Sequence, residues 1–223
     1  ILVESSNIGM ARLLTRLVPE DRPNDTAAMR PVFDLLYALG FGARTGVPLP
    51  AETAGLVTRL PEWKRNYTLA SVSFGQETVV SALQMAAAAS SLADGVRRSP
   101  RLVASPRDVA GGAHPSSQRV FQRQHVDWVR GWMARSVSEG SCQELIDLGV
   151  PVAGKTGTAD DEVDKEAEVH SYCALVPADD PMLTLVVVLR DPQGVRYSSE
   201  SAAPTAAAVL RRALPYLGQP VAP

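Results

Sequence analysis

Two β-rich runs near the end of the chain constrain its fold more than any other feature of the sequence. Residues 170–176 and residues 182–190 are rich in the aliphatic, β-branched and aromatic side chains that strands favour. The segment between them reads Pro-Ala-Asp-Asp-Pro, and these residue types build turns. Because strands joined by so short a connection pair antiparallel, the sequence predicts a hairpin here.

Several stretches of the chain before the hairpin have a helical pattern. After the polar cluster Ser5-Ser6-Asn7, apolar residues recur at helical spacing, so a helix is predicted to begin near Asn7. Other helices are predicted over residues 27–39, with Pro31 in the first turn, 78–93, which is apolar enough for the core, 122–138 and 206–217. The remaining predictions are an ordered loop over 45–60, a short strand over 101–104 and a flexible loop over 111–117.

The order of these elements indicates a fold class. Helices come first and hairpin strands later, without regular alternation of strand and helix, which is typical of an α+β domain. The sequence contains no internal repeat and no convincing linker, so nothing divides residues 1–223 into separate domains.

Composition excludes several classes of function. The 22 Lys and Arg residues nearly balance 24 Asp and Glu residues, for a formal charge of -2 and a pI of about 6.0. This balance predicts no nucleic-acid surface and no polybasic membrane contact. Cys142 and Cys173 lie far apart, without the spacing of a disulfide scaffold or a zinc site. The longest apolar run, residues 185–189, is too short to cross a bilayer, and no signal peptide is visible.

Residues 152–159 read Val-Ala-Gly-Lys-Thr-Gly-Thr-Ala and combine a cation, hydroxyl groups and glycine in an extended segment. Gly157 would let the backbone of a ligand come close. Alternation along a strand would place Lys155 and Gly157 on one face and Thr156 and Thr158 on the other, unless a bulge intervenes. A lone Lys-Thr-Gly also occurs in surface turns, so the segment alone does not define a site.

A second polar cluster, Ser5-x-Asn7, stands at the first predicted helix start, where Ser and Asn commonly serve only as caps. The combination is more informative than either motif. Ser-x-x-Lys, Ser-Asp-Asn and Lys-Thr-Gly together are the signature of serine β-lactamases and penicillin-binding proteins. The second and third elements occur here in that order.

The similarity extends beyond these motifs. Residues 1–223 resemble the class B, cell-division type of penicillin-binding protein, from the second motif to the end of the transpeptidase domain. The matching stretches are Glu-Ser-Ser-Asn-Ile-Gly at 4–9, Thr-Gly-Val-Pro-Leu-Pro at 45–50, Ser-Phe-Gly-Gln-Glu at 73–77, Leu-Gln-Met-Ala at 83–86, residues 152–159 and, more loosely, Ala-Ala-Pro at 202–204. The resemblance implies a mostly antiparallel sheet flanked by helices, with residues 1–223 as the C-terminal portion of a single transpeptidase domain.

The resemblance also implies a function. The parent protein would be a peptidoglycan D,D-transpeptidase that cross-links D-Ala-D-Ala stem peptides through a serine acyl-enzyme and binds β-lactam antibiotics. No cofactor and no metal is implied. The protein would lie on the extracytoplasmic side of the cell envelope, with a membrane anchor in its N-terminal part and with cell-wall synthesis proteins as partners.

Roles follow by carrying the family's motifs over residue by residue. Ser5 would relay a proton toward the leaving nitrogen, and Asn7 would hydrogen-bond the substrate amide. Lys155 would supply positive charge near this relay and the substrate carboxylate. Thr156 and Thr158 would donate to that carboxylate, and the Thr158 N–H would form half of an oxyanion hole. The resemblance thus assigns catalysis to Ser5, Asn7 and Lys155, and substrate binding to Thr156, Gly157 and Thr158, on a strand that would bind the stem peptide as an added strand.

One part of the signature is missing. Ser-x-x-Lys requires a serine three residues before a lysine, but Lys64, Lys155 and Lys165 follow Pro61, Val152 and Glu162 at that distance. In the family the nucleophile lies upstream of the second motif. The chain opens on Ile1 rather than Met, so we expect a fragment whose missing N-terminal part holds the nucleophile, and we expect the fragment alone to be inactive.

Two other hypotheses remain open from the sequence. Residues 149–156 satisfy the phosphate-loop pattern G-x-x-x-x-G-K-[ST], which would indicate nucleotide binding if a strand preceded the loop and a helix followed it. Alternatively, the parent protein could keep the fold without the chemistry, as a non-catalytic scaffold or β-lactam sensor of the cell envelope.

Other chemistry-bearing residues have structural interpretations. His170 and Cys173 lack further ligands at metal-binding spacing, so we interpret them as a strand-edge histidine and a core cysteine. Trp128 and Trp132 share one helix face and are expected to pack. The acidic run 160–166 is expected to form a solvated hairpin loop.

Overall fold

The chain folds into two compact units. The computed structural model describes residues 1–102, 117–140, 148–161, 164 and 166–219. The first unit comprises Ile1, Ser6–Ser91 and Val96–Val120, and the second comprises Leu2–Ser5, Leu92–Gly95 and Phe121–Pro223.

The first unit contains several helices and helical turns. Its elements are α1 (Asn7–Thr15), α2 (Thr26–Ala38), the 3-10 turn η1 (Leu60–Glu62), the π-helical turn η2 (Arg65–Leu69), α3 (Ala70–Val72) and α4 (Ala82–Asp94), whose last turn belongs to the second unit. Buried Met29, Trp63 and Leu69 belong to the main apolar cluster of this unit. Burial of such large apolar side chains is the main stabilising contribution to this helical packing.

Polar side chains define where the first two helices begin. The Ser6 hydroxyl accepts a hydrogen bond from Gly9 N at 3.1 Å, which caps α1 and confirms the helix predicted near Asn7. The Asp25 carboxylate accepts from the first free N–H groups of α2. Because this cap sets the start at Thr26, Pro31 lies inside the helix and not in its first turn, which corrects the prediction.

Helix α4 begins later than predicted because Ser81 and Gln84 cap it reciprocally. Ser81 N donates to Gln84 Oε1 at 2.8 Å and Gln84 N donates to Ser81 Oγ at 3.1 Å. The preceding residues form strand β2 (Thr78–Val79) instead. The Gln84 side chain is buried, as predicted for this helix, and its Nε2 donates to the carbonyls of Ala43 and Ala54 at 2.9 Å each. Gln84 therefore links α4 to the loop between α2 and β1 (Leu56–Val57).

Short strand pairs complete the first unit. Strands β1 and β2 pair antiparallel, as do β3 (Val96–Arg98) and β4 (Ser117–Arg119). The ordered loop predicted over residues 45–60 is thus interrupted by β1. Arg101 and Leu102 lie outside any strand, and the rest of the strand predicted over 101–104 lies outside the described residues. The loop predicted over 111–117 also lies outside them, except for Ser117, which begins β4.

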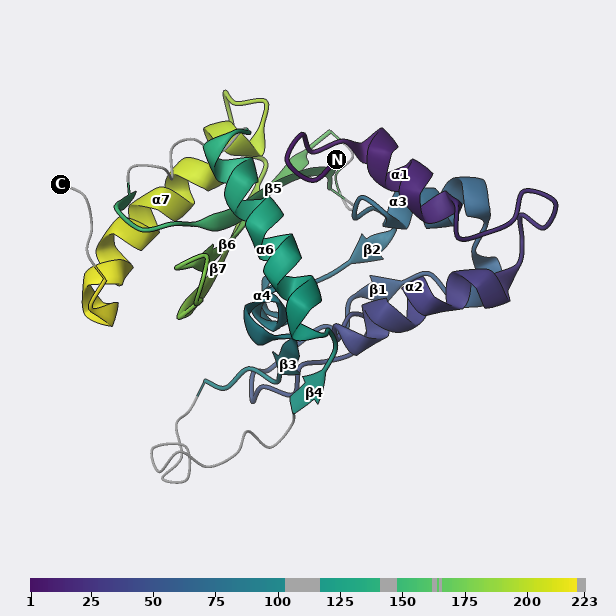
Figure 1. Cartoon of the computed structure of the whole chain (residues 1–223), viewed down its shortest axis with the longest axis horizontal. Coiled ribbons are helices and arrows are strands. Elements are labelled where there is room, and N and C mark those ends of the chain that lie inside the picture. Colours follow the sequence, from purple (N-terminus) through teal and green to yellow (C-terminus); the bar gives the residue numbers. More distant parts are fainter. Residues whose placement is uncertain (103–116, 141–147, 162–163, 165, 220–223) are drawn as a thin grey trace. The chain divides into compact units, whose positions relative to one another are not determined.

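The second unit is built on a three-stranded antiparallel sheet (Figure 1). Its strands are β5 (Ala153–Asp160), β6 (Glu168–Val176) and β7 (Leu183–Arg190), in that spatial order. Strands β6 and β7 form the hairpin predicted from the sequence, with Val176 opposite Leu183. The pairing of β5 with β6 runs unbroken from Ala153 to Asp160, so no bulge interrupts the site strand.

Helices cover both faces of this sheet (Figure 1). Tyr172, Ala174 and Val176 alternate along β6 and contact the buried alanines and leucines of α7 (Ala202–Ala213) and the turn η5 (Leu214–Leu217). Leu175, which points to the opposite face, packs with Met133 of α6 (Arg123–Ser138). Helix α7 begins four residues earlier than predicted, directly after the turn η4 (Ser198–Glu200). Helices around antiparallel strands confirm the α+β class.

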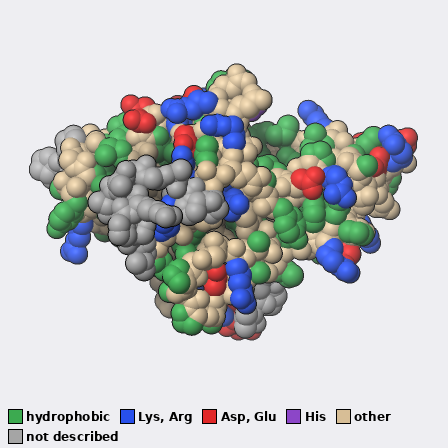
Figure 2. Space-filling model, turned by 90° about the horizontal axis from the view of Figure 1, so that it is seen from below, with side chains coloured by type: hydrophobic (Ala, Val, Ile, Leu, Met, Phe, Trp, Pro, Cys, Tyr) green, Lys and Arg blue, Asp and Glu red, His purple; other side chains and the backbone are tan. Residues whose placement is uncertain are grey.

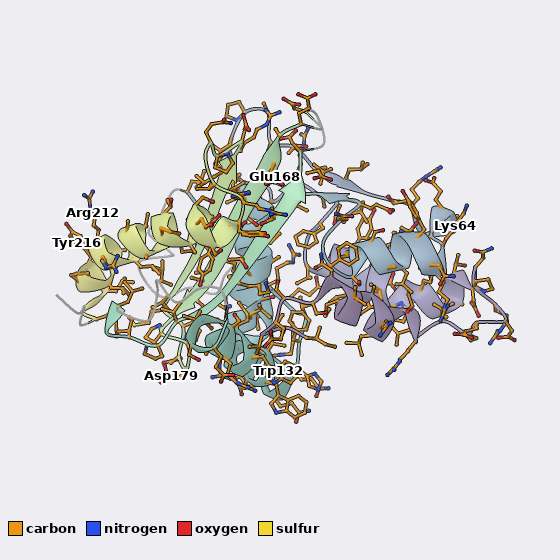
Figure 3. All side chains as sticks on the ribbon, turned by 90° about the horizontal axis from the view of Figure 1, so that it is seen from above. Lys64, Trp132, Glu168, Asp179, Arg212 and Tyr216 are labelled. Atoms are coloured by element: carbon orange, nitrogen blue, oxygen red, sulfur yellow. The ribbon has the colours of Figure 1, made fainter. Side chains whose placement is uncertain are left out.

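One prediction about surface residues is wrong, and another holds only in part. Trp128 and Trp132 are exposed by 58% and 46%, and Figure 3 shows Trp132 pointing away from the sheet. The inner face of α6 is instead filled by residues three and four positions apart that include Val126 and Met133. In the acidic run, Asp160, Asp164 and Glu166 are exposed as predicted. Asp161 is buried instead, and its carboxylate accepts two hydrogen bonds from Arg190, at 2.6 and 3.2 Å.

The surface carries charges of both signs. Figure 2 shows Lys and Arg side chains interspersed with Asp and Glu on the visible face. Among the described residues, no helix is both long and apolar enough to cross a membrane.

Candidate functional site

The second unit brings together two motif residues that lie far apart in the sequence. Lys155 Nζ donates to Ser5 Oγ at 2.6 Å and to its neighbour's carbonyl, Thr156 O, at 3.0 Å. Ser5 has a positive φ of 52°, a conformation that costs energy for a residue with a side chain. Capping of α1 falls to Ser6, so the Ser5 hydroxyl is directed at the lysine rather than at the helix. The pair places a hydroxyl and a cation in direct contact.

The register of β5 places the motif side chains on two faces. Lys155 pairs with Cys173 and Gly157 with Ser171, whereas Thr156 pairs with Tyr172 and Thr158 with His170. Since directly opposed residues share a face, Lys155 and Gly157 lie on one face and both threonines on the other. The predicted alternation is confirmed.

Both glycines of the motif have close neighbours on β6. A Cβ atom at position 154 would lie 1.7 Å from the Tyr172 hydroxyl oxygen, and one at position 157 would lie 2.7 Å from Ser171 Oγ. At position 154 the buried Tyr172 ring leaves no room for a side chain, whereas at position 157 an added Cβ would require the Ser171 hydroxyl to move.

Strand β5 becomes more accessible along its length. Ala153 and Gly154 are buried, Lys155 is partly exposed, and Thr158 to Asp160 are exposed. In the part of the chain that the structure describes, β5 pairs with β6 alone, so its other edge has no strand beside it. An edge strand with glycine in it can accept an extended peptide by main-chain hydrogen bonds.

Sequence reasoning missed a side chain that reaches this strand from the turn before α7. Ser198 is only 1% exposed, and its hydroxyl lies 2.7 Å from Thr158 Oγ1 and also donates to the Gly157 carbonyl. Ser198 is separated from the motif by about forty residues and belongs to no motif, so only the tertiary fold shows the contact. The sole hint in the sequence is the cluster of serines at 198, 199 and 201.

His170 is not the strand-edge residue predicted, since it lies in the central strand and is fully buried. Its Nδ1 lies 2.7 Å from Ser201 Oγ and its Nε2 lies 3.0 Å from Glu168 Oε2. Burial raises the pKa of the Cys173 thiol to about 12, so this side chain is neutral at pH 7 and does not offer a thiolate. The described residues include no group of three His, Cys, Asp or Glu side chains that could hold a metal ion.

The phosphate-loop hypothesis is contradicted by the same strand. Lys155 and Thr156 lie inside β5, whereas a phosphate loop places these two residues at the opening of a helix. The backbone N–H groups around Lys155 therefore cannot form the cradle that binds a nucleotide phosphate.

Comparison with known proteins identifies the family. The penicillin-binding protein transpeptidase domain matches residues 1–211. This chain belongs to that family.

Three relatives show how much of such a protein the chain represents. Penicillin-binding protein PbpB of Mycolicibacterium smegmatis is 29% identical over 223 residues, covering 90% of this chain and 32% of PbpB. Stage V sporulation protein D of Bacillus subtilis is 27% identical over 230 residues, which cover 98% of this chain and 34% of that protein. The probable peptidoglycan D,D-transpeptidase PbpC of Pseudomonas aeruginosa is 28% identical over 206 residues, which cover 88% of this chain and 33% of PbpC. The chain thus spans about a third of the length of these relatives.

Solved structures confirm the transpeptidase fold. Penicillin-binding protein 3 of Mycobacterium tuberculosis, complexed with ampicillin, superposes with a TM-score of 0.80 at 26% identity, covering 100% of this chain and 51% of that one. The transpeptidase domain of Burkholderia pseudomallei penicillin-binding protein 3 also gives 0.80, at 24% identity over 96% of this chain and 62% of that one.

One motif residue predicted for the site, Asn7, is assigned to a different unit from the others. It is the first residue of α1 and belongs to the first unit, whereas Ser5, Lys155 and Thr158 belong to the second. Its predicted contact with the substrate amide stays a prediction.

Proposed function

We propose that this chain forms one wall of the active site of a peptidoglycan D,D-transpeptidase that cross-links stem peptides through a serine acyl-enzyme and binds β-lactams. The observation that carries the proposal is the 2.6 Å contact between Ser5 Oγ and Lys155 Nζ, beside the open edge of β5. Membership in the transpeptidase family and the name of the Pseudomonas relative support it.

In this proposal each group has a distinct chemical task. A lysine cation against the Ser5 hydroxyl favours proton transfer through that hydroxyl to a leaving nitrogen. The same cation attracts the carboxylate of a stem peptide or β-lactam, with Thr156 beside it. The Thr158 N–H would stabilise the tetrahedral oxyanion, and Asn7 would bind the substrate amide. Gly157 would allow the added peptide strand to approach.

The nucleophile is not among these residues. No serine in the sequence stands three residues before a lysine, so we propose that a Ser-x-x-Lys elsewhere in the full-length protein forms the acyl bond. The chain would then complete the oxyanion hole and the proton relay of a single transpeptidase domain.

We further propose where the protein acts in the cell. Substrates built from peptidoglycan place the domain on the extracytoplasmic side of the cell envelope. A membrane anchor and partners in cell-wall synthesis, including a role in division, are proposed on the same grounds, because class B relatives of this kind, such as stage V sporulation protein D, match nearly the whole chain.

Acylation by a fluorescent penicillin tests the proposal directly. In the full-length protein, Lys155→Ala should slow acylation about a hundredfold or more, as loss of a transition-state electrostatic contact does. Lys64→Ala removes an exposed lysine of the first unit and serves as the matched control. Equal acylation rates in the two variants would contradict the assigned role of Lys155. A covalent adduct on the 223-residue chain alone would contradict the external nucleophile.

A further inference from the structure

The peptide group between Gly157 and Thr158 is held by hydroxyls from outside β5. The Ser198 hydroxyl donates to the Gly157 carbonyl, and the Ser171 hydroxyl donates to the same oxygen at 3.2 Å. A serine hydroxyl has one proton, so the 2.7 Å contact between Ser198 and Thr158 has the Thr158 hydroxyl as donor. The Ser198 N–H closes the ring on Thr158 Oγ1 at 3.4 Å.

Peptide geometry couples these bonds to the proposed oxyanion donor. The Gly157 carbonyl and the Thr158 N–H belong to one planar trans peptide, in which the two groups point in opposite directions. Anchoring the carbonyl therefore sets the direction of the N–H. Pairing of Gly157 with Ser171 already restrains this peptide, and the hydroxyl bonds add to that restraint at the exposed end of the strand.

The turn that carries Ser198 is itself fastened at both ends. The Glu200 carboxylate accepts from Arg196 N at 2.9 Å and Tyr197 N at 3.0 Å, and these bonds lower the pKa of Glu200. At the other end, Ser201 contacts the buried His170 at 2.7 Å. Ser198 thus reaches β5 from a rigid support.

The His170 contacts have the composition of a hydrolytic triad but not its accessibility. His170 contacts Ser201 through one ring nitrogen and Glu168 through the other. Glu168 is the first residue of β6 (Figure 3). Because the imidazole is fully buried, a substrate cannot approach it, and the three residues fasten η4 to the sheet instead.

We propose that Ser198 is a positioning residue of the transpeptidase site, which orients the Thr158 N–H toward the oxyanion by holding the Gly157 carbonyl. This inference rests on the proposed function, since that function assigns the oxyanion to Thr158. Ser198 acts through the peptide group and makes no contact with substrate. Ser171 assists it from the other face of the sheet.

Ser198→Ala in the full-length protein tests the inference. The loss of one neutral hydrogen bond should lower the first-order acylation rate constant about two- to tenfold. The dissociation constant of the preceding non-covalent complex with fluorescent penicillin should stay the same. Ser199→Ala, in the same turn, is the matched control, because the Ser199 side chain makes no hydrogen bond to the described residues of β5. Ser171→Ala should show a smaller loss, and the double variant a larger one than Ser198→Ala.

The outcomes separate positioning from other roles. Acylation of Ser198→Ala at the rate of Ser199→Ala would overturn the inference, and so would a loss confined to the dissociation constant. If the wild-type protein fails to acylate, the proposed function fails. Deuterium exchange over residues 153–160 still tests whether Ser198 holds the Gly157 peptide. Faster exchange in Ser198→Ala than in Ser199→Ala supports it, and equal exchange refutes it.

Discussion

Replacing Gly154 by alanine introduces a methyl group where the structure has no room for one. The new Cβ would lie 1.7 Å from the Tyr172 hydroxyl oxygen, 2.6 Å from its Cζ and 3.1 Å from a methyl group of Val137. Normal contact requires about 3.5 Å, so the Tyr172 ring would have to move by almost 2 Å. Tyr172 is 1% exposed and lies in the apolar cluster beneath α7, where such a shift disturbs several neighbours.

The expected loss is about 3 kcal/mol of unfolding free energy or more, the upper range for overpacking a core. Urea denaturation of the full-length protein measures it. Gly131→Ala is the matched control, because nothing lies within 4 Å of its added Cβ and the site is an exposed helix interior. This control should stabilise α6 by about 0.5–1 kcal/mol.

The same substitution in a Tyr172→Phe variant tests which atom of Tyr172 causes the clash. In Tyr172→Phe the atom closest to the new methyl group is absent, so Gly154→Ala should cost less there than in the wild type. If Gly154→Ala unfolds at the same urea concentration as the wild type, Tyr172 does not lie against this glycine. An unchanged cost in the Phe background would refute the argument from the hydroxyl.

Two further predictions concern the first unit. Gln84→Leu should destabilise the protein by about 2–4 kcal/mol, because it removes a buried side chain that donates to three backbone carbonyls, and urea denaturation checks this against the exposed change Ala82→Leu. The pKa of Glu52 is lowered mainly by a hydrogen bond from the Thr45 hydroxyl, so its contribution to stability is present above the unfolded pKa and is lost as pH falls through the folded pKa. The difference in stability between wild type and Glu52→Gln should therefore be larger at pH 7 than below about pH 4, and a constant difference would contradict the loop contact.

Local patterns in the sequence predicted most elements and few of their boundaries. The hairpin of β6 and β7 was predictable because short apolar runs around a Pro-Asp turn leave little choice of structure. Helix starts were less predictable, since α4 begins where Ser81 and Gln84 cap each other and not where its apolar run begins. Burial was predictable only where apolar residues recur with the period of a helix or strand. The exposure of Trp132 and the full burial of His170 were not predicted.

By itself, the sequence determined the family resemblance, the strand that carries Lys155 and Thr158, and the alternation of their side chains, because these depend on residue type and a local period of two. Tertiary structure alone decided that Ser5 meets Lys155 and that Ser198 holds the Gly157 peptide. These contacts join segments about 150 and 40 residues apart. They exist only because packing of the sheet, α6 and α7 brings the chain back on itself, and no local spacing encodes that return.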